Sequence, residues 1–255
     1  MKQRLRHIGA LLVAALLVCA AAPAAAQTVQ QQNQEILNEL KAIHQLLDTL
    51  ASRLTAPPAA AAGRPDNRVR LSDVSGFALG RADAPLTMVE FTDLQCPFCR
   101  QFHVTAFEQI KKDYIDTGKL RYISRDFPID QLHPLATSAA RVGRCAADQG
   151  KFWEMRHLIL ANNSSLTSAR FPDFAKELQL DMAAFTACVA NTTLHDADLR
   201  KDADDAARVG VTGTPSFVVG PTIADGLDGY LLVGAQPYPT FDAGLKELLA
   251  KLPAK

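Results

Sequence analysis

Two cysteines separated by two residues constrain this chain more than any other feature. Cys96, Pro97, Phe98 and Cys99 follow a strand-like stretch at residues 86–93 and open an apolar helical run. The first backbone N–H groups of a helix have no partner within the helix, and together with the helix dipole they favour a thiolate at Cys96. With a second thiol one turn away, the pair predicts a redox couple.

The first residues of the chain are typical of an export signal. A basic start at residues 1–7 precedes an Ala/Leu/Val run and a small-residue cleavage pattern that ends at Ala26. We therefore expect a signal peptide at residues 1–26, whose removal also removes Cys19. A lipid anchor at Cys19 is the alternative, and the larger Val18 before it disfavours this. No later apolar run reaches the length of a membrane span, so we expect a soluble exported protein.

Export changes what the other cysteines and the charges mean. An oxidising compartment makes disulfides the default for the four remaining cysteines and argues against a structural zinc site. The full chain has 27 basic and 27 acidic residues, and the signal peptide removes three basic ones, which leaves a net charge of −3. This balance gives no reason to expect nucleic acid or an anionic membrane as a partner. The remaining length suffices for one globular domain and an appendage.

The appendage is an expected oligomerisation helix at residues 27–54. A Pro/Ala/Gly linker at residues 55–67 follows it and separates it from the rest of the chain. An amphipathic helix that folds back on its own domain is the alternative. The heptad repeat favours a coiled coil. Leucine at heptad position a and isoleucine at position d favour more than two strands, and Asn33 at position a could fix the register. Spacings of four and three alternate along Val29, Asn33, Ile36, Leu40, Ile43, Leu47, Leu50 and Leu54.

The globular domain is expected at residues 68–255, in an α/β order. Its middle part, about residues 133–209, is rich in alanine and carries helical signals, so we expect an inserted helical subdomain there. Asp181 is a candidate N-cap within it. The other expected elements are a strand at 86–93, a helix at 97–117, a strand at 119–124, strands at 216–219 and 230–233 and a helix at 241–252.

Four segments together resemble the DsbA-like branch of the thioredoxin superfamily. They are residues 89–100 around the dithiol, 126–129, 150–154 and 211–217. The resemblance covers residues 68–252. It implies a thioredoxin fold with an inserted helical subdomain, here preceded by the coiled-coil helix, and it implies neither a cofactor nor a metal.

The resemblance also assigns roles to individual residues. It makes Cys96 the exposed attacking thiol and Cys99 the more buried resolving thiol. Thr214 and Pro215 resemble the cis-proline turn beside the dithiol, where an extended client peptide could pair with a backbone edge. Pro97 and Phe98 complete the expected substrate-binding surface.

The side chains of Glu90, His103 and Phe98 bear on the reactivity of the dithiol. Glu90 matches the family's buried acid, whose pKa apolar surroundings would raise and which would relay a proton to or from Cys99; it could instead point to solvent. His103, one turn beyond Cys99, is expected to be a surface histidine. Phe98 stands where strongly oxidising members of the family have histidine, which leads us to expect an intermediate redox potential.

Cys145 and Cys188 are expected to form a structural disulfide. Both lie on apolar helix faces of an exported chain, and some DsbA-like proteins have a second bridge in the insert. Closing a separation of 43 residues would stabilise the fold by about 4 kcal/mol. Two buried thiols are the alternative.

The expected function is disulfide isomerisation or reduction on exported client proteins in the periplasm. The coiled-coil seam resembles the ScsC-like and DsbC-like oligomeric isomerases, which implies a dimer or trimer and a DsbD-like membrane partner. The alternative is a DsbA-type oxidase recharged by a DsbB-like partner. A non-catalytic peptide-binding chaperone is a third hypothesis, which the intact dithiol disfavours.

Overall fold

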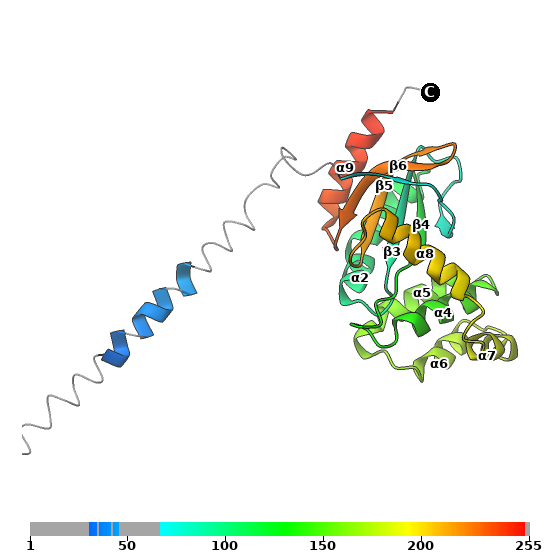
Figure 1. Ribbon diagram of the computed structural model, residues 1–255, viewed down its shortest axis with the longest axis horizontal. Helices are drawn as coiled ribbons and strands as arrows, with labels where there is room; N and C mark the ends of the chain where they lie inside the picture. The colour runs from blue at the N-terminus through cyan, green and yellow to red at the C-terminus, as the bar shows by residue number, and fades with distance from the viewer. Residues whose placement is uncertain (1–30, 35, 42, 46–66, 253–255) are drawn as a thin grey trace, which may run out of the picture. The chain divides into compact units, whose positions relative to one another are not determined.

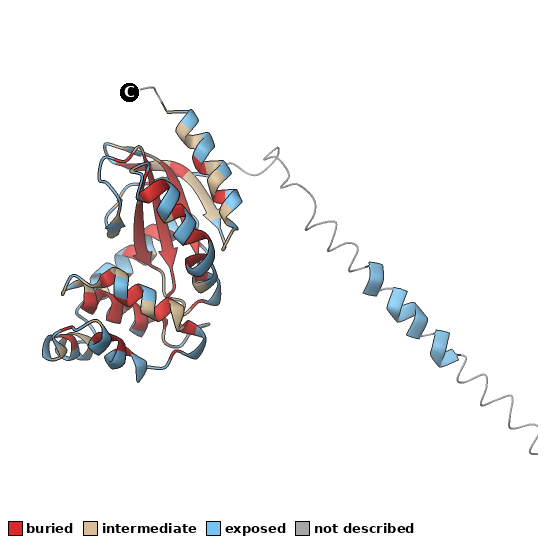
Figure 2. Cartoon of the chain, turned by 180° about the vertical axis from the view of Figure 1, so that it is seen from behind, coloured by how far each residue is buried: buried red, intermediate tan, exposed pale blue. Residues whose placement is uncertain are grey.

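The computed structural model describes residues 31–34, 36–41, 43–45 and 67–252. The chain divides into two units, Met1–Arg64 and Pro65–Lys255. In the first unit the described residues are helical and exposed (Figure 2). Their apolar side chains, Ile36, Leu37, Leu40 and Ile43, are each 50–54% exposed. The predicted signal peptide, residues 55–66 of the predicted linker and the rest of the heptad seam lie outside the described residues.

The second unit is built on a mixed six-stranded sheet in the order β1-β6-β5-β3-β4-β2. Only β3 and β4 run parallel among the neighbouring strands, and the other four pairs are antiparallel. All seven residues of β3 are buried, because strands flank it on both sides and helices cover both faces. The strands are β1 Arg68–Leu71, β2 Phe77–Leu79, β3 Leu86–Thr92, β4 Leu120–Asp126, β5 Ser216–Ile223 and β6 Gly226–Val233.

One face of the sheet is covered by the helix that follows β3 and by the last helix. The first is continuous from α2 through η2, as predicted for residues 97–117, and Gly118 at φ 73° ends it. Its buried side chains, such as Phe102 and Ile110, pack with Phe241 of the last helix against the sheet. The elements are α2 Pro97–Phe102, η1 His103–Phe107, α3 Glu108–Ile110, η2 Lys111–Ile115 and α9 Tyr238–Ala250.

The helices between β4 and β5 confirm the predicted helical insert. Four of them, α4 to α7, form an apolar cluster beyond the end of β3, whereas α8 runs back along the second face of the sheet (Figure 1). Asp181 caps α7, as predicted, because its side chain accepts hydrogen bonds from the backbone of Ala183 and Ala184. The elements are α4 Ala136–Ala147, α5 Phe152–Ala161, η3 Asn163–Ser165, α6 Arg170–Glu177, α7 Met182–Ala190 and α8 Asp196–Arg208.

Two strands were not predicted, β5 and β6 are longer than the strands expected at 216–219 and 230–233, and the last helix begins earlier than expected. The edge strands β1 and β2 were not predicted, because runs of three or four residues carry too little alternation and are fixed by their partners β6 and β4. The last helix begins at Tyr238 rather than Phe241. A proline in its first turn needs no hydrogen-bond acceptor there and suits that position.

A buried network of ion pairs joins the insert to the sheet. Arg125, at the end of β4, is fully buried and donates to Asp202 at 2.6 Å and to Asp205 at 2.7 Å, both on α8. Arg144 of α4 donates to Asp126 at 2.7 Å and also to Asp202 at 2.6 Å. Burial raises the pKa of Asp126 to about 6, against the opposing effect of Arg144. Three elements from distant parts of the chain are thereby held together.

Loss of Asp202 should destabilise the protein strongly. Asp202→Ala leaves two buried guanidinium groups short of a partner, so we expect the free energy of unfolding to fall by about 3–5 kcal/mol in urea denaturation. Asp225→Ala removes an exposed partner of Arg70 and serves as the control, with an expected loss below about 1 kcal/mol. Equal losses in the two variants would contradict a structural role for the network.

Candidate active site

The dithiol lies at the junction of β3 and α2. Cys96 is the N-cap of α2, with φ −68° and ψ 127°, and Pro97 opens the first turn. The Cys96 N–H donates to the Asp93 carbonyl at 3.0 Å, which closes the turn after the strand. Both Cys96 and Cys99 are free thiols. The placement agrees with the predicted strand, dithiol and helix.

Side chains from two other segments hold the loop before Cys96. The Asp93 carboxylate accepts from the Ile129 N–H at 3.0 Å and lies 2.8 Å from His133 Nδ1. Asn163, in the insert, donates from Nδ2 to the Cys96 carbonyl at 3.0 Å. No pattern in the sequence predicts these contacts, which fix the position of the first cysteine relative to the insert.

Cys96 is more covered than expected. Its residue is 3% exposed, and Cys99 is fully buried. The expectation of an exposed attacking thiol is therefore wrong, because the apolar cluster of the insert packs around both cysteines. The cis Thr214–Pro215 bond lies beside the pair, and the Cys96 thiol donates to the Thr214 carbonyl at 3.5 Å. Phe98, in contrast, is 60% exposed.

The surroundings of the two thiols move their pKa values in opposite directions. A hydrogen bond from the Cys99 thiol, assisted by the Cys99 and Phe98 backbone N–H groups, lowers the pKa of Cys96 to about 5 although burial opposes the shift. Burial raises the pKa of Cys99, and the adjacent Cys96 sulfur and the charge of Glu90 raise it further. At neutral pH the pair can therefore present one thiolate, at Cys96, beside one thiol, at Cys99.

Glu90 lies on β3 and is fully buried, so the solvent-facing alternative is wrong. The expectation of apolar surroundings is wrong, because Arg156 and Tyr122 contact the carboxylate. Oε2 accepts from Arg156 Nη2 at 2.5 Å and from the Tyr122 hydroxyl. Among the described residues, Oε1 of Glu90 has no hydrogen-bond partner. Oε1 is therefore the Glu90 oxygen that could accept a hydrogen bond from a further group.

His103 is buried, contrary to the expected surface position, because α5 packs over it. Its Nδ1 lies 3.3 Å from Arg156 Nη1, and its Nε2 lies 3.0 Å from Nδ1 of His157. Burial, with the charge of Arg156 and the neighbouring His157, lowers the pKa of His103 to about 3. A cavity of about 340 Å³ is lined by both histidines and Trp153. A chain of polar side chains thus runs from this cavity to Glu90.

Sequence reasoning missed Arg156 and His157. A signal was present, because the two stand within the apolar run from Met155 to Leu160 of α5. A charge in such a run is buried only with a partner. Nothing in the sequence identified Glu90 as that partner, 66 positions earlier in the chain.

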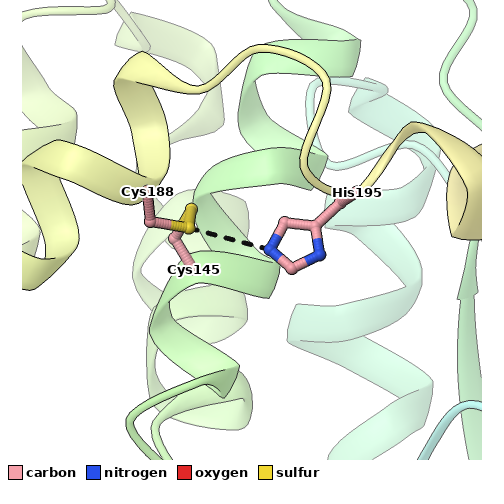
Figure 3. Close-up of side chains that lie close together, drawn as sticks. All are labelled: Cys145, Cys188 and His195. Atoms are coloured by element: carbon pink, nitrogen blue, oxygen red, sulfur yellow. Dashed lines mark hydrogen bonds between the residues drawn. A yellow bond between two sulfur atoms is a disulfide. The ribbon is translucent and has the colours of Figure 1, made fainter.

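Cys145 and Cys188 form a disulfide in the structure. The S–S distance is 1.98 Å and the Cα atoms lie 5.8 Å apart. The bond links α4 to α7, and His195 lies beside it (Figure 3).

Comparisons with known proteins agree with this architecture. A family model described as thioredoxin matches residues 72–230. The crystal structure of alpha-DsbA1 from Wolbachia pipientis is similar, with 25% sequence identity and a TM-score of 0.60 over 68% of this chain and 90% of that one. The predicted thioredoxin fold with a helical insertion is confirmed.

Curated proteins with similar sequences fall into two kinds. A probable disulfide bond formation protein D from Bacillus anthracis is 30% identical over 155 residues, which are 58% of this chain and 71% of that protein. The Na(+)/H(+) antiporter NhaA 3 of Salinispora tropica is 36% identical over 140 residues, which are 55% of this chain but 21% of the antiporter. The chain thus spans about one fifth of the antiporter's length. The predicted resemblance to DsbA-like proteins is confirmed.

The reactivity of Cys96 should depend on pH with a midpoint near 5. In the reduced protein we expect iodoacetamide to label Cys96 with a rate that rises through pH 5 and levels off above it, measured by mass spectrometry. The pKa of Cys96 in the folded, reduced protein lies below the ordinary thiol value of 9.0. The Cys96 thiolate therefore adds its full contribution to the stability of the folded, reduced protein above pH 9. This contribution is lost as the pH falls through 5.

Cys99→Ala removes the thiol that donates to Cys96 and should move the labelling midpoint to higher pH. A midpoint near 9 in the unaltered protein, or no change in the variant, would contradict the assigned cause.

Proposed function

The chain belongs to the thioredoxin family, and we propose that it is a thiol–disulfide oxidoreductase that acts on exported proteins through Cys96 and Cys99. The opposite pKa shifts of these two free thiols carry the proposal. The low pKa of Cys96 makes its thiolate both a nucleophile and a good leaving group, and the raised pKa of Cys99 keeps that thiol protonated. Disulfide exchange requires this division of roles.

In the oxidising direction the dithiol starts as a disulfide. A client thiolate attacks Cys96 Sγ, the Cys96–Cys99 bond breaks, and Cys99 leaves as a thiolate that takes up a proton. A second client thiolate then attacks the client sulfur of the mixed disulfide and releases Cys96 as a thiolate. Two electrons pass from the client to the dithiol. The second step is favoured because a thiol of low pKa is a good leaving group.

Glu90 is proposed to exchange the proton with Cys99. Its charge acts on Cys99, and its Oε1 has no other partner in the described part of the chain. Arg156 holds the other oxygen at 2.5 Å and keeps the carboxylate in place. A buried thiol of raised pKa needs a nearby base before it can attack the mixed disulfide.

The client is proposed to bind across Phe98 and the Thr214–Pro215 turn. Phe98 and Pro97 are exposed beside the thiol, and the Thr214 carbonyl lies within 3.5 Å of Cys96. An exposed aromatic ring offers apolar contact to an unfolded segment, and a free backbone edge offers hydrogen bonds of the β type. Both interactions tolerate many client sequences.

Oxidation of clients is the direction that the site supports better. A thiolate of low pKa stabilises the reduced dithiol, which makes the disulfide form a stronger oxidant. The name of the relative from Bacillus anthracis, a probable disulfide bond formation protein, supports the same direction. We propose a membrane partner of the DsbB-like kind that reoxidises the dithiol, and an exported, periplasmic location. Within the described residues no helix is both long and apolar enough to span a membrane.

Isomerisation is the second candidate, and a separate observation favours it. The apolar side chains at residues 36, 37, 40 and 43 share an exposed helical stripe. Association of such stripes in a dimer or trimer would bring several dithiols to one client and favour reshuffling over net oxidation. A DsbD-like partner would then keep the dithiol reduced.

Glu90→Gln should slow the step that needs the proton of Cys99. We expect release of a preformed mixed disulfide by Cys99 to fall by about 10²-fold, with the first attack by Cys96 little changed, in stopped-flow measurements. Glu154→Gln, on the exposed face of α5, is the control and should change neither rate. An unchanged release rate in Glu90→Gln would exclude the proton exchange.

The function is tested by trapping the mixed disulfide. In Cys99→Ser, Cys96 is first converted to a mixed disulfide with an aromatic thiol. A thiolate of a reduced, unfolded client should then displace that aromatic thiol and leave a covalent complex on non-reducing gels, whereas Cys96→Ser should form none. The unaltered oxidised protein should remove two client thiols per chain. Failure of both would contradict an oxidoreductase function. Recovery of a scrambled client without added oxidant would favour the isomerase.

A further inference from the structure

The disulfide of the insert lies within a cluster of metal-binding side chains. Cys145 lies in the last turn of α4, Cys188 lies on α7 and His195 precedes α8, and their ligand atoms are all within 4.8 Å of one another. Figure 3 shows the His195 ring with a nitrogen directed at the disulfide, and the distance from Nε2 to Cys188 Sγ is 3.7 Å. Three helices that are separate in the sequence therefore supply sulfur and nitrogen to one point.

A carboxylate completes the set. Asp148, the C-cap of α4, places Oδ2 at 3.4 Å from His195 Nε2 and at 3.6 Å from Cys188 Sγ. Two sulfurs, one imidazole nitrogen and one carboxylate oxygen are ligands that Zn²⁺ takes in a tetrahedral arrangement. Asp148 is exposed, whereas Cys145 is buried, so an ion can reach the cluster from the Asp148 side.

The orientation of His195 is a second, independent observation. Its side chain is 14% exposed, and its Nδ1 faces Oδ2 of Asp198 at 3.9 Å. Metal-binding histidines usually have a carboxylate near the nitrogen that does not bind the metal, which fixes the ring and its tautomer. Nδ1 thus lies on the side of Asp198, whereas Nε2 is directed at the sulfurs and at Asp148.

We propose that reduction of the Cys145–Cys188 disulfide converts this cluster into a Zn²⁺ site whose ligands are Cys145, Cys188, His195 and Asp148. A dithiol reductant supplies two electrons and two protons, breaks the S–S bond and closes its own disulfide. Zn²⁺ then displaces the two thiol protons into solvent and binds the neutral imidazole. The site is separate from the Cys96–Cys99 pair and does not depend on the proposed exchange activity.

The change needs little movement of the backbone. Two sulfurs bound to one tetrahedral zinc are about 3.8 Å apart, given Zn–S bonds of about 2.3 Å. The Cα atoms of Cys145 and Cys188 are 5.8 Å apart, so rotation of the side chains can supply most of the separation. Disulfide and zinc use the same sulfur atoms and exclude each other. Oxidation would release the metal, and zinc would keep α4 and α7 joined in the reduced protein.

The experiment uses the full chain with Cys19→Ser, Cys96→Ser and Cys99→Ser, which leaves Cys145 and Cys188 as its cysteines. A phosphine reductant cleaves the remaining disulfide, taking its oxygen from water as phosphorus is oxidised. Zn²⁺ is then titrated against a coloured chelator. We expect one Zn²⁺ per reduced chain and none per oxidised chain, and Co²⁺ should give a sulfur-to-cobalt charge-transfer band and the spectrum of a tetrahedral ion.

Variants of the cluster distinguish zinc binding at a site with four ligands from zinc binding by the two thiols alone. Asp198→Asn should weaken zinc binding by about 10-fold to 100-fold, and His195→Ala by more than that. His44→Ala, at an exposed position in the first unit, is the matched control and should leave the affinity unchanged.

Absence of zinc from the reduced chain would overturn the proposal, as would equal binding by the oxidised chain. Unchanged zinc affinity in His195→Ala would also overturn the proposal. This is the result expected if the reduced insert unfolds and its two thiols alone bind the metal.

Discussion

The buried ion pairs between β4, α4 and α8 are the interaction on which the site depends. Arg125 and Arg144 lie where water cannot compensate their charges, so their presence is tolerated only while the aspartates of α8 and Asp126 remain in place. Such pairs contribute little net stability compared with apolar packing, but they permit few alternative arrangements. The insert is thereby fixed against the carboxyl end of β4, and its apolar cluster forms one wall of the dithiol.

Electrostatics then makes two chemically identical side chains different. Cys96 stands at a helix start with N–H groups close by, whereas Cys99 is fully buried above a carboxylate. Arg156 binds one oxygen of Glu90, and the charge of Glu90 still raises the pKa of Cys99. The pKa of Cys96 is lowered from within the motif, by the Cys99 thiol and the Cys99 and Phe98 N–H groups, whereas burial in the surrounding fold and the charge of Glu90 raise the pKa of Cys99.

The sequence allowed the fold to be predicted wherever a pattern was local. The dithiol at a helix start, the helical insert and the Asp181 cap all rest on residues within one or two turns of each other. The errors concern contacts over long separations. Cys96 is covered partly by Thr214, 118 positions away, and His103 by residues of α5 more than 50 positions away. The periodicity of a sequence does not indicate such contacts. The charge of Arg156 within an apolar run was the one signal, and it indicated a buried partner without identifying Glu90.

The position of the insert has a consequence for how the chain folds. The central strand β3 pairs with β5 on the far side of the insert, and the side chains of Thr87 and Thr222 meet across 135 positions. Closing so long a loop costs more entropy than forming the β3–β4 pair or the contacts among the insert helices. The sheet can therefore be completed only late, after the helices that shorten this path have formed. Until then the edge of β3 that later receives β5 is open to another chain, which makes the half-formed domain a target for chaperones.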